Sequence, residues 1–234
     1  MPNELLLILS LIFIYGCSLL AYRLFGKNGL YGMTVAATIL ANIEVLIMVK
    51  AFGLDQTLGN VLFSVTFVIT DILSENEGKK AANRAVNIGI AFSIFFLIVS
   101  QSWMLYRPSA EDWASPSIAT IFSNTPRMIA ASLIVYAISQ KCDVWLYHKW
   151  WELTDKKFGK HRAFLWLRNN GSTLLSQLVN SVLFNVAAFA GVYSTSVLIS
   201  ICLSTYLIYV VCALLDTPIV YLARKMKESG KVPD

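Results

Sequence analysis

Apolar residues gather in seven runs, which shorter polar and basic stretches separate. The runs cover approximately residues 5–25, 31–52, 58–75, 83–106, 127–149, 171–191 and 195–223. A helix that crosses a bilayer needs roughly 20 predominantly apolar residues, and most of the runs reach that length. We therefore predict an all-α, polytopic helical membrane protein that forms a single domain over residues 1–234.

Two stretches of the sequence leave the number of membrane spans open. The run at 58–75 is short and ends in charged residues, so it either crosses the bilayer or only dips into it. The longest connection, 107–126, contains Pro108, Pro116 and Pro126, which predicts an irregular segment at the surface. The pattern thus predicts six to seven transmembrane helices.

Composition supports the membrane class. Hydrophobic residues make up 56% of the chain and charged residues 14%, whereas about a quarter of a typical soluble domain is charged. The net charge of +5 would suit nucleic acid, but the basic residues lie between the apolar runs, where they orient a protein in the bilayer. The lipid bilayer is therefore the expected partner, and nucleic acid is not.

Motifs for catalysis or for binding a cofactor are absent from the sequence. It contains no HExxH, no GxSxG and no GxxxxGK[ST]. The four cysteines lie inside apolar runs and form no CxxC, so we interpret them as buried thiols. We expect neither an enzyme nor a cofactor or metal site.

The distribution of basic residues predicts the orientation. Lys and Arg cluster after the first, third, fifth and seventh runs, and they are sparse in the alternate connections. Cytoplasmic loops are enriched in these residues. We therefore predict a multi-pass protein of the cell inner membrane, with its N-terminus periplasmic and its C-terminus cytoplasmic.

Several apolar runs also carry ionisable residues, each of which costs roughly 2.5–3.5 kcal/mol at the centre of a membrane helix. Asp71 and Glu75 are one helical turn apart, so they share a face. Gln140 and Asp143 share a face of a later run in the same way. Such groups must be paired, hydrated or close to the membrane surface, and together they suggest a central polar cavity.

Other charged positions allow two interpretations. Glu44 either faces the cavity or pairs with Lys50 or another helix, and Arg127 either lines the cavity or anchors a helix at the interface. Asp216 precedes Thr217-Pro218, which favours a helix kink near the membrane edge.

A polar stripe marks the run at 171–191 and the residues before it. Arg168 begins it, and spacings of three and four residues continue it through Asn169, Thr173, Ser176, Gln177, Asn180 and Phe184. Small polar residues can simply join helices to one another, but a long stripe with amides favours the wall of a wet cavity. The candidate substrate-binding residues are Asp71, Glu75, Glu44, Arg127, Gln140, Asp143, Arg168, Gln177, Asn180 and Phe184.

Three patches resemble the queuosine precursor transporter family, which is also described as a vitamin uptake transporter family. The first patch is Phe67-Val-Ile-Thr-Asp-Ile-Leu-Ser-Glu together with Gly78-Lys-Lys80. The second patch is Arg127 with Ala131-Ser132, followed by Ser139-Gln-Lys-Cys-Asp143. The third patch is Leu167-Arg168 with Ser172-Thr173, Ser176 to Phe184 and Ala188 to Gly191. Their order and spacing, from about residue 42 to 191, carry the resemblance. The chain departs from the family pattern at Asn180, where Asp is expected.

The resemblance implies an importer of 7-cyano-7-deazaguanine or 7-aminomethyl-7-deazaguanine, bases that supply the queuosine modification of tRNA. An alternative is a substrate-binding membrane subunit that needs a separate ATP-driven partner, and a third is an intramembrane enzyme. The chemistry of the residues suits the base, because its N1–H and amino group are donors that a carboxylate accepts. The sequence leaves open whether the chain forms a homodimer.

The predicted orientation can be tested with topology reporters. A reporter fused after Lys231 should read cytoplasmic, and one inserted within 109–117 should read external, because basic loops stay in the cytoplasm. An external reading after Lys231 would overturn the orientation.

Overall fold

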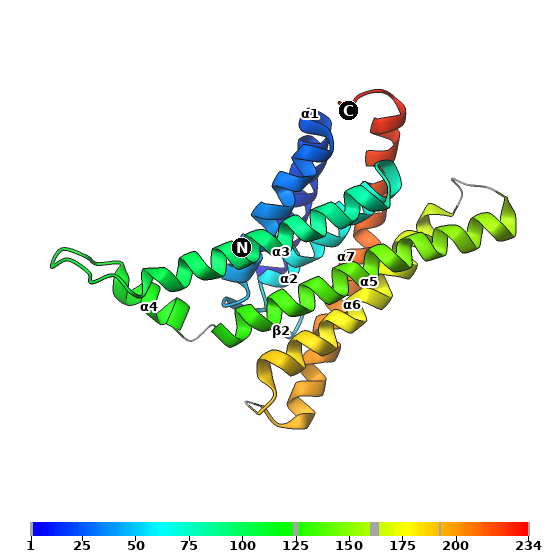
Figure 1. The fold of residues 1–234 in the computed structure, drawn as a ribbon. Coiled ribbons are helices and arrows are strands. Elements are labelled where there is room, and N and C mark those ends of the chain that lie inside the picture. The colour runs from blue at the N-terminus through cyan, green and yellow to red at the C-terminus, as the bar shows by residue number, and fades with distance from the viewer. Residues whose placement is uncertain (1, 124–125, 160–163, 192, 234) are drawn as a thin grey trace.

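The computed structural model describes residues 2–123, 126–159, 164–191 and 193–233, with the side chains at 55 and 123–129 outside that description. The elements in chain order are α1 (Asn3–Glu44), β1 (Met48–Ala51), β2 (Leu54–Thr57), α2 (Gly59–Asn76), α3 (Lys79–Trp103), α4 (Ser115–Ser123), α5 (Pro126–Phe158), α6 (Leu165–Phe189) and α7 (Thr195–Glu228). Helices form nearly all of this architecture (Figure 1).

Helix α1 contains two arms that reverse direction at Gly26. A straight helix of its 42 residues would be about 63 Å long, yet the side chain of Asn3 donates to the backbone oxygen of Lys50, 2.9 Å away. Gly26 has non-helical dihedrals (φ 57°, ψ −143°), and a Cβ on Gly29 would collide with the carbonyl oxygen of Ala21. The two arms are therefore antiparallel and correspond to the first two predicted runs.

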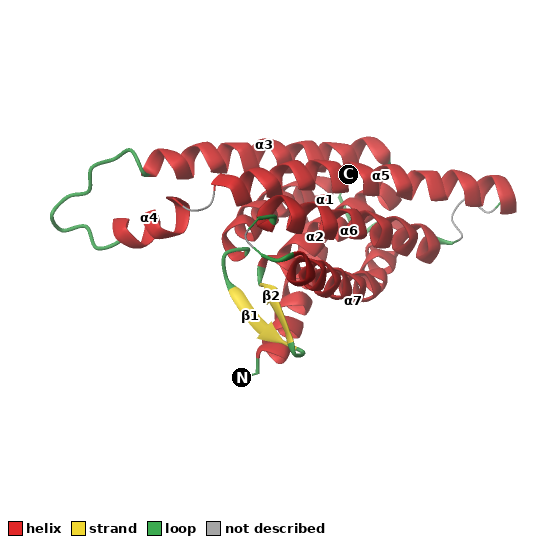
Figure 2. Cartoon of the chain, turned by 90° about the horizontal axis from the view of Figure 1, so that it is seen from below, coloured by secondary structure: helices red, strands yellow, loops and turns green. Residues whose placement is uncertain are grey.

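The prediction for the second run was wrong beyond Glu44. That run was expected to continue to residue 52, but the helix ends and a short antiparallel hairpin follows, in which Met48 pairs with Thr57 and Ala51 with Leu54. Glu4 accepts a hydrogen bond from the backbone of Phe52, so the hairpin lies beside the N-terminus (Figure 2). Because Ile47 and Met48 are apolar, hydropathy alone could not separate this strand from the helix before it.

Helix α2 lies at the centre of the bundle. Of its 18 residues, all but Phe63 and Asn76 are buried. It contacts α1, α3, α5 and α7. The short run at 58–75 is thus a helix enclosed by other helices, and for this reason its polar residues need not face lipid.

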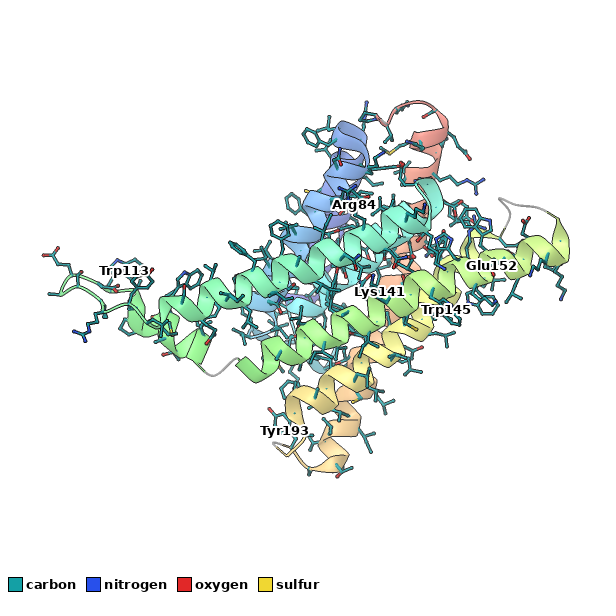
Figure 3. The ribbon with its side chains drawn as sticks, viewed as in Figure 1. Arg84, Trp113, Lys141, Trp145, Glu152 and Tyr193 are labelled. Carbon is teal, nitrogen blue, oxygen red and sulfur yellow. The ribbon has the colours of Figure 1, made fainter. Side chains whose placement is uncertain are left out.

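The remaining helices surround α2. Helix α5 packs chiefly against α6, and α3 runs beside α5 (Figure 1). Lys141 on α5 donates to Asn83 and Asn87 on α3, at 3.3 and 2.6 Å. The connection predicted to be irregular contains α4, and it projects from the bundle with Trp113 near its tip (Figure 3).

Length and composition identify four described helices that can cross a membrane, α1, α3, α6 and α7. Large apolar side chains cover their outer surfaces, for example Phe13, Ile98 and Leu203, each more than 60% exposed. Such an apolar exterior is expected of a protein whose solvent is lipid. The chain is therefore a helical membrane protein of the all-α class that also contains one small β-hairpin.

The reversal at Gly26 can be tested by substitution. Gly26→Ala should lower the thermal unfolding midpoint in detergent, because a Cβ there would lie 2.5 Å from the carbonyl oxygen of Pro233 and the positive φ is strained for alanine. A strained backbone position costs on the order of 1–3 kcal/mol. Gly32→Ala is the matched control, since a Cβ there meets no atom within 4 Å. Equal midpoints for the two variants would contradict the reversal.

Candidate functional site

A polar core runs through the bundle and begins with two buried carboxylates. Asp71 on α2 and Asp143 on α5 are both 0% exposed. Thr173 and Ser176 on α6 each donate one hydrogen bond, to Asp71 Oδ2 at 3.0 Å and to Asp143 Oδ1 at 2.8 Å. The carboxylate pair thus joins three helices.

Amide groups form the next layer. The side chain of Gln140 bridges α5 to α2, because its Nε2 lies 2.6 Å from Thr66 Oγ1 and its Oε1 accepts from Thr70 at 3.2 Å. Ser139 donates to Asn180 on α6 at 3.4 Å. These contacts bring together residues that lie between 41 and 74 positions apart in the chain.

Asp216 also belongs to the polar core, an inward position that the sequence did not predict. It is 2% exposed, and Asn169 Nδ2 donates to its Oδ1 at 2.9 Å. Its backbone still lies two residues before Pro218, inside α7. The proline suggested a kink, but only the packing of α6 on α7 brings this carboxylate inward.

A buried ion pair closes the core at the end where α2 terminates. Arg168 Nε and Nη2 donate to Glu75, with the closest contact at 2.7 Å, and both side chains are at most 1% exposed. Tyr147 donates to the same carboxylate at 2.7 Å. The guanidinium carbon lies 4.2 Å from the ring centroid of Trp151, a favourable cation–π contact.

A second set of charges lies next to this pair, nearer the C-terminus. Arg224 approaches Glu75 at 3.5 Å, and Lys227 pairs with Glu77 at 3.0 Å. Tyr22 on α1 donates to Glu77 at 2.9 Å. We call the buried pair and these contacts the ion layer; it ties α1, α2, α5, α6 and α7 together at one end of the bundle.

The opposite end of the core leads to a pocket. A small inner pocket has room of about 30 Å³ and is lined by Asn180, Phe184, Asn60, Tyr209 and residues of α1, α2 and α5. About one water molecule fits in that space. Asp71 and Asp143 do not line this pocket, so the predicted cavity shared with Asn180 is not seen in this conformation.

The structure separates the predicted site residues into groups. Asp71, Gln140, Asp143, Gln177 and Asn180 are buried in the core. Glu75 and Arg168 bind each other in the ion layer, and Phe184 lines the inner pocket.

The two remaining predictions fall elsewhere. Glu44 is half-buried at the end of α1, where neighbouring Val45 packs on Gly59, so about three helical turns of α2 separate it from Asp71. The side chain of Arg127 lies outside the described residues.

Several residues that complete these layers were not predicted from the sequence. Tyr147 and Arg224 bind Glu75 in the ion layer, and Tyr22 binds Glu77 there. Asn60 and Tyr209 bind each other beside the inner pocket. Tyrosines and terminal arginines are common at membrane interfaces, so their types gave no sign of this role. Among the described residues, no three His, Cys, Asp or Glu side chains gather where they could hold a metal ion.

An enclosed polar core inside an apolar helical bundle is expected of membrane proteins that handle polar solutes. The family described as "Putative vitamin uptake transporter" matches residues 57–223, and the chain belongs to this family. A curated protein of Bacillus subtilis (strain 168), named "Probable queuosine precursor transporter", is 37% identical over 208 residues, which cover 89% of each chain. No solved structure matches the chain.

The buried ion pair generates a stability prediction. Arg168→Met should destabilise the protein by about 3–5 kcal/mol, because it leaves the charge of Glu75 buried without its main partner. Lys149→Met is the control, since its pair with Glu152 is at least half exposed and should be worth about 0–1 kcal/mol.

The loss can be assigned by a double-mutant cycle on thermal unfolding in detergent. Glu75→Gln combined with Arg168→Met should recover part of the stability that Arg168→Met loses, since no unpaired charge remains. Equal losses of stability for Arg168→Met and Lys149→Met would show that the buried pair of Arg168 and Glu75 stabilises the protein no more than an exposed pair does.

Proposed function

We propose that this chain imports a 7-deazaguanine precursor of queuosine, 7-cyano-7-deazaguanine or 7-aminomethyl-7-deazaguanine, across the inner membrane. The name of the Bacillus subtilis relative supports the substrate class. The membership of a transporter family supports import rather than catalysis.

The observation that carries the proposal is a surplus of unpaired acceptors in the polar core. Asp71 Oδ1, Asp143 Oδ2, Asn169 Oδ1 and Gln177 Oε1 are all buried and accept no hydrogen bond from a described donor. Each such group costs roughly 1–3 kcal/mol when it is left unsatisfied. A ligand rich in donors would therefore stabilise this core.

A deazaguanine base has the matching edge. Its N1–H and exocyclic amino group are adjacent donors, which carboxylate oxygens accept well, and its O6 accepts from amides such as that of Asn180. The ring carries carbon in place of N7, so the usual two-point contact of arginine with O6 and N7 is not available. This chemistry favours Asp71 and Asp143 over Arg168 as the groups that recognise the base.

The arrangement of helices supports seven spans with the N-terminus outside. The two arms of α1, then α2, α3, α5, α6 and α7 make seven helical segments, and the described termini lie at opposite ends, with Asn3 beside Lys50 and Gly26 beside Pro233. The end with Pro233 carries the basic residues of the ion layer, as a cytoplasmic side should. In this orientation the ion layer is a closed cytoplasmic gate.

Binding and uptake by the purified protein test the proposal. The protein should bind 7-cyano-7-deazaguanine in calorimetry, and it should accumulate the base in liposomes that contain no other protein. Asp71→Asn should weaken binding at least tenfold, because the amide replaces an acceptor by a donor. An analogue without the exocyclic amino group should also bind at least tenfold more weakly, since a buried acceptor is then left unpaired.

Asp112→Asn is the matched control. Asp112 lies in the projecting connection, where hydrogen bonds from Ser115 and Ala114 lower the pKa of its carboxyl group and keep it ionised. Its replacement removes one carboxylate outside the core and should leave binding unchanged. Binding without uptake would favour a subunit that needs an ATP-driven partner, and equal binding by Asp71→Asn and the parent would exclude Asp71 from the site.

A further inference from the structure

A second hollow lies beyond the inner pocket, at the end of the bundle that carries the N-terminus. It has a volume of about 600 Å³, within the range of small-molecule sites. The hairpin, the start of α2, the end of α6 and the start of α7 form its walls. We call this hollow the hairpin groove. Its lining includes the aromatic and amide residues Gln56, Asn60, Phe184, Asn185, Phe189 and Tyr193.

Aromatic rings form one wall of the hairpin groove. The ring centroids of Phe184 and Phe189 lie 6.2 Å apart, and those of Phe189 and Tyr193 lie 5.7 Å apart. Tyr193 is about half exposed and stands at the turn between α6 and α7 (Figure 3). Stacking of a base on an aromatic ring is worth roughly 1–3 kcal/mol and requires only that the ligand be planar.

Amide side chains supply the polar contacts. Gln56 is 4% exposed, and its Oε1 accepts no hydrogen bond from a described donor. Asn60 and Asn185 also line the groove and are 7% and 2% exposed. An unpaired acceptor next to aromatic rings suits a flat ligand that has N–H groups along its edge.

The charge of the groove narrows the ligand class further. Among the described residues that line it, none is Asp, Glu, Lys or Arg. A charged ligand would lose its hydration there without gaining an ion pair. The groove therefore suits a neutral, planar heteroaromatic ligand.

The groove also connects to the polar core. Val45, Asn60 and Phe184 line both the groove and the inner pocket, and the inner pocket reaches Asn180. With room for about one water molecule, the inner pocket is too small for a base in this conformation. A ligand from this side must therefore remain in the groove until Phe184 and its neighbours move.

We propose that the hairpin groove is a first binding site, which holds a neutral planar base between its aromatic and amide walls before the base passes Phe184 and Asn180 into the polar core. The role in import rests on the proposed function and applies to its neutral candidate, 7-cyano-7-deazaguanine, because the amine of the aminomethyl base is protonated at neutral pH. The site itself differs from the carboxylate pair in position and in chemistry.

Protection of an introduced cysteine tests occupancy of the groove. Ser200→Cys places a thiol on an exposed lining position, and Ser194→Cys places one on the exposed loop outside the lining. Reaction with a membrane-impermeant maleimide is followed by peptide mass spectrometry at the introduced position. Saturating 7-cyano-7-deazaguanine should slow labelling of Ser200→Cys at least threefold and leave Ser194→Cys unchanged.

The same measurement in an Asp71→Asn background separates the two sites. Protection of Ser200→Cys should persist there, because the groove contains no residue of the carboxylate pair. Loss of protection in that background, or no protection in the parent while uptake continues, would overturn the groove as a site and leave the import proposal intact. No binding, protection or uptake at all would overturn both proposals.

Uptake kinetics provide a second readout. Tyr193→Ala should raise the KM for uptake about tenfold with little change in the maximal rate, whereas Tyr193→Phe should retain the parental KM because it keeps the ring. Tyr221→Ala, at a similarly exposed position near the other end of α7, is the control and should leave KM unchanged. A parental KM for Tyr193→Ala would count against the aromatic wall.

Discussion

The stability of the bundle depends on pairing its buried charges, because an unpaired charge is costly inside a membrane protein. Glu75 is fully buried near the end of α2, and Arg168 satisfies it through several hydrogen bonds while resting on Trp151. An uncompensated charge would cost several kcal/mol in this environment, so the helices that bring the partners are held together. Helix α2 can then be enclosed on all sides and carry polar residues through the interior.

The two ends of the polar core differ in how they are closed. Charges close the end near the C-terminus, whereas aromatic and amide side chains close the hairpin end. Water that enters the ion layer would lower the cost of separating its charges, because hydration replaces the lost contacts. The apolar and amide contacts at the hairpin end can open without any separation of charges. For the import that we propose, this asymmetry favours a state in which the hairpin end opens while the ion layer stays closed.

Between these ends, unpaired acceptors give the core its chemical preference. Asp71, Asp143 and Gln177 each keep a buried oxygen without a described donor. A folded protein tolerates this cost where a ligand supplies the missing hydrogen bonds. Asn180 adds an amide that can donate or accept, and it stands between the acceptors and the inner pocket. In the import route that we propose, the core would favour a ligand with a donor-rich edge, and the hairpin groove would favour a flat neutral ring.

The sequence alone determined the class of protein and most of its helices, because membrane crossing depends on local length and apolarity, as in α3, α6 and α7. It also identified Asp71 and Asp143 as carboxylates whose burial in a membrane helix is costly, and therefore as candidates for a functional site. Only the tertiary structure decided their partners, since Thr173 lies 102 positions from Asp71. The same holds for the pairing of Glu75 with Arg168 and for the inward position of Asp216. Contacts between distant helices leave no local pattern, so the layers of the core became visible only when the helices were packed.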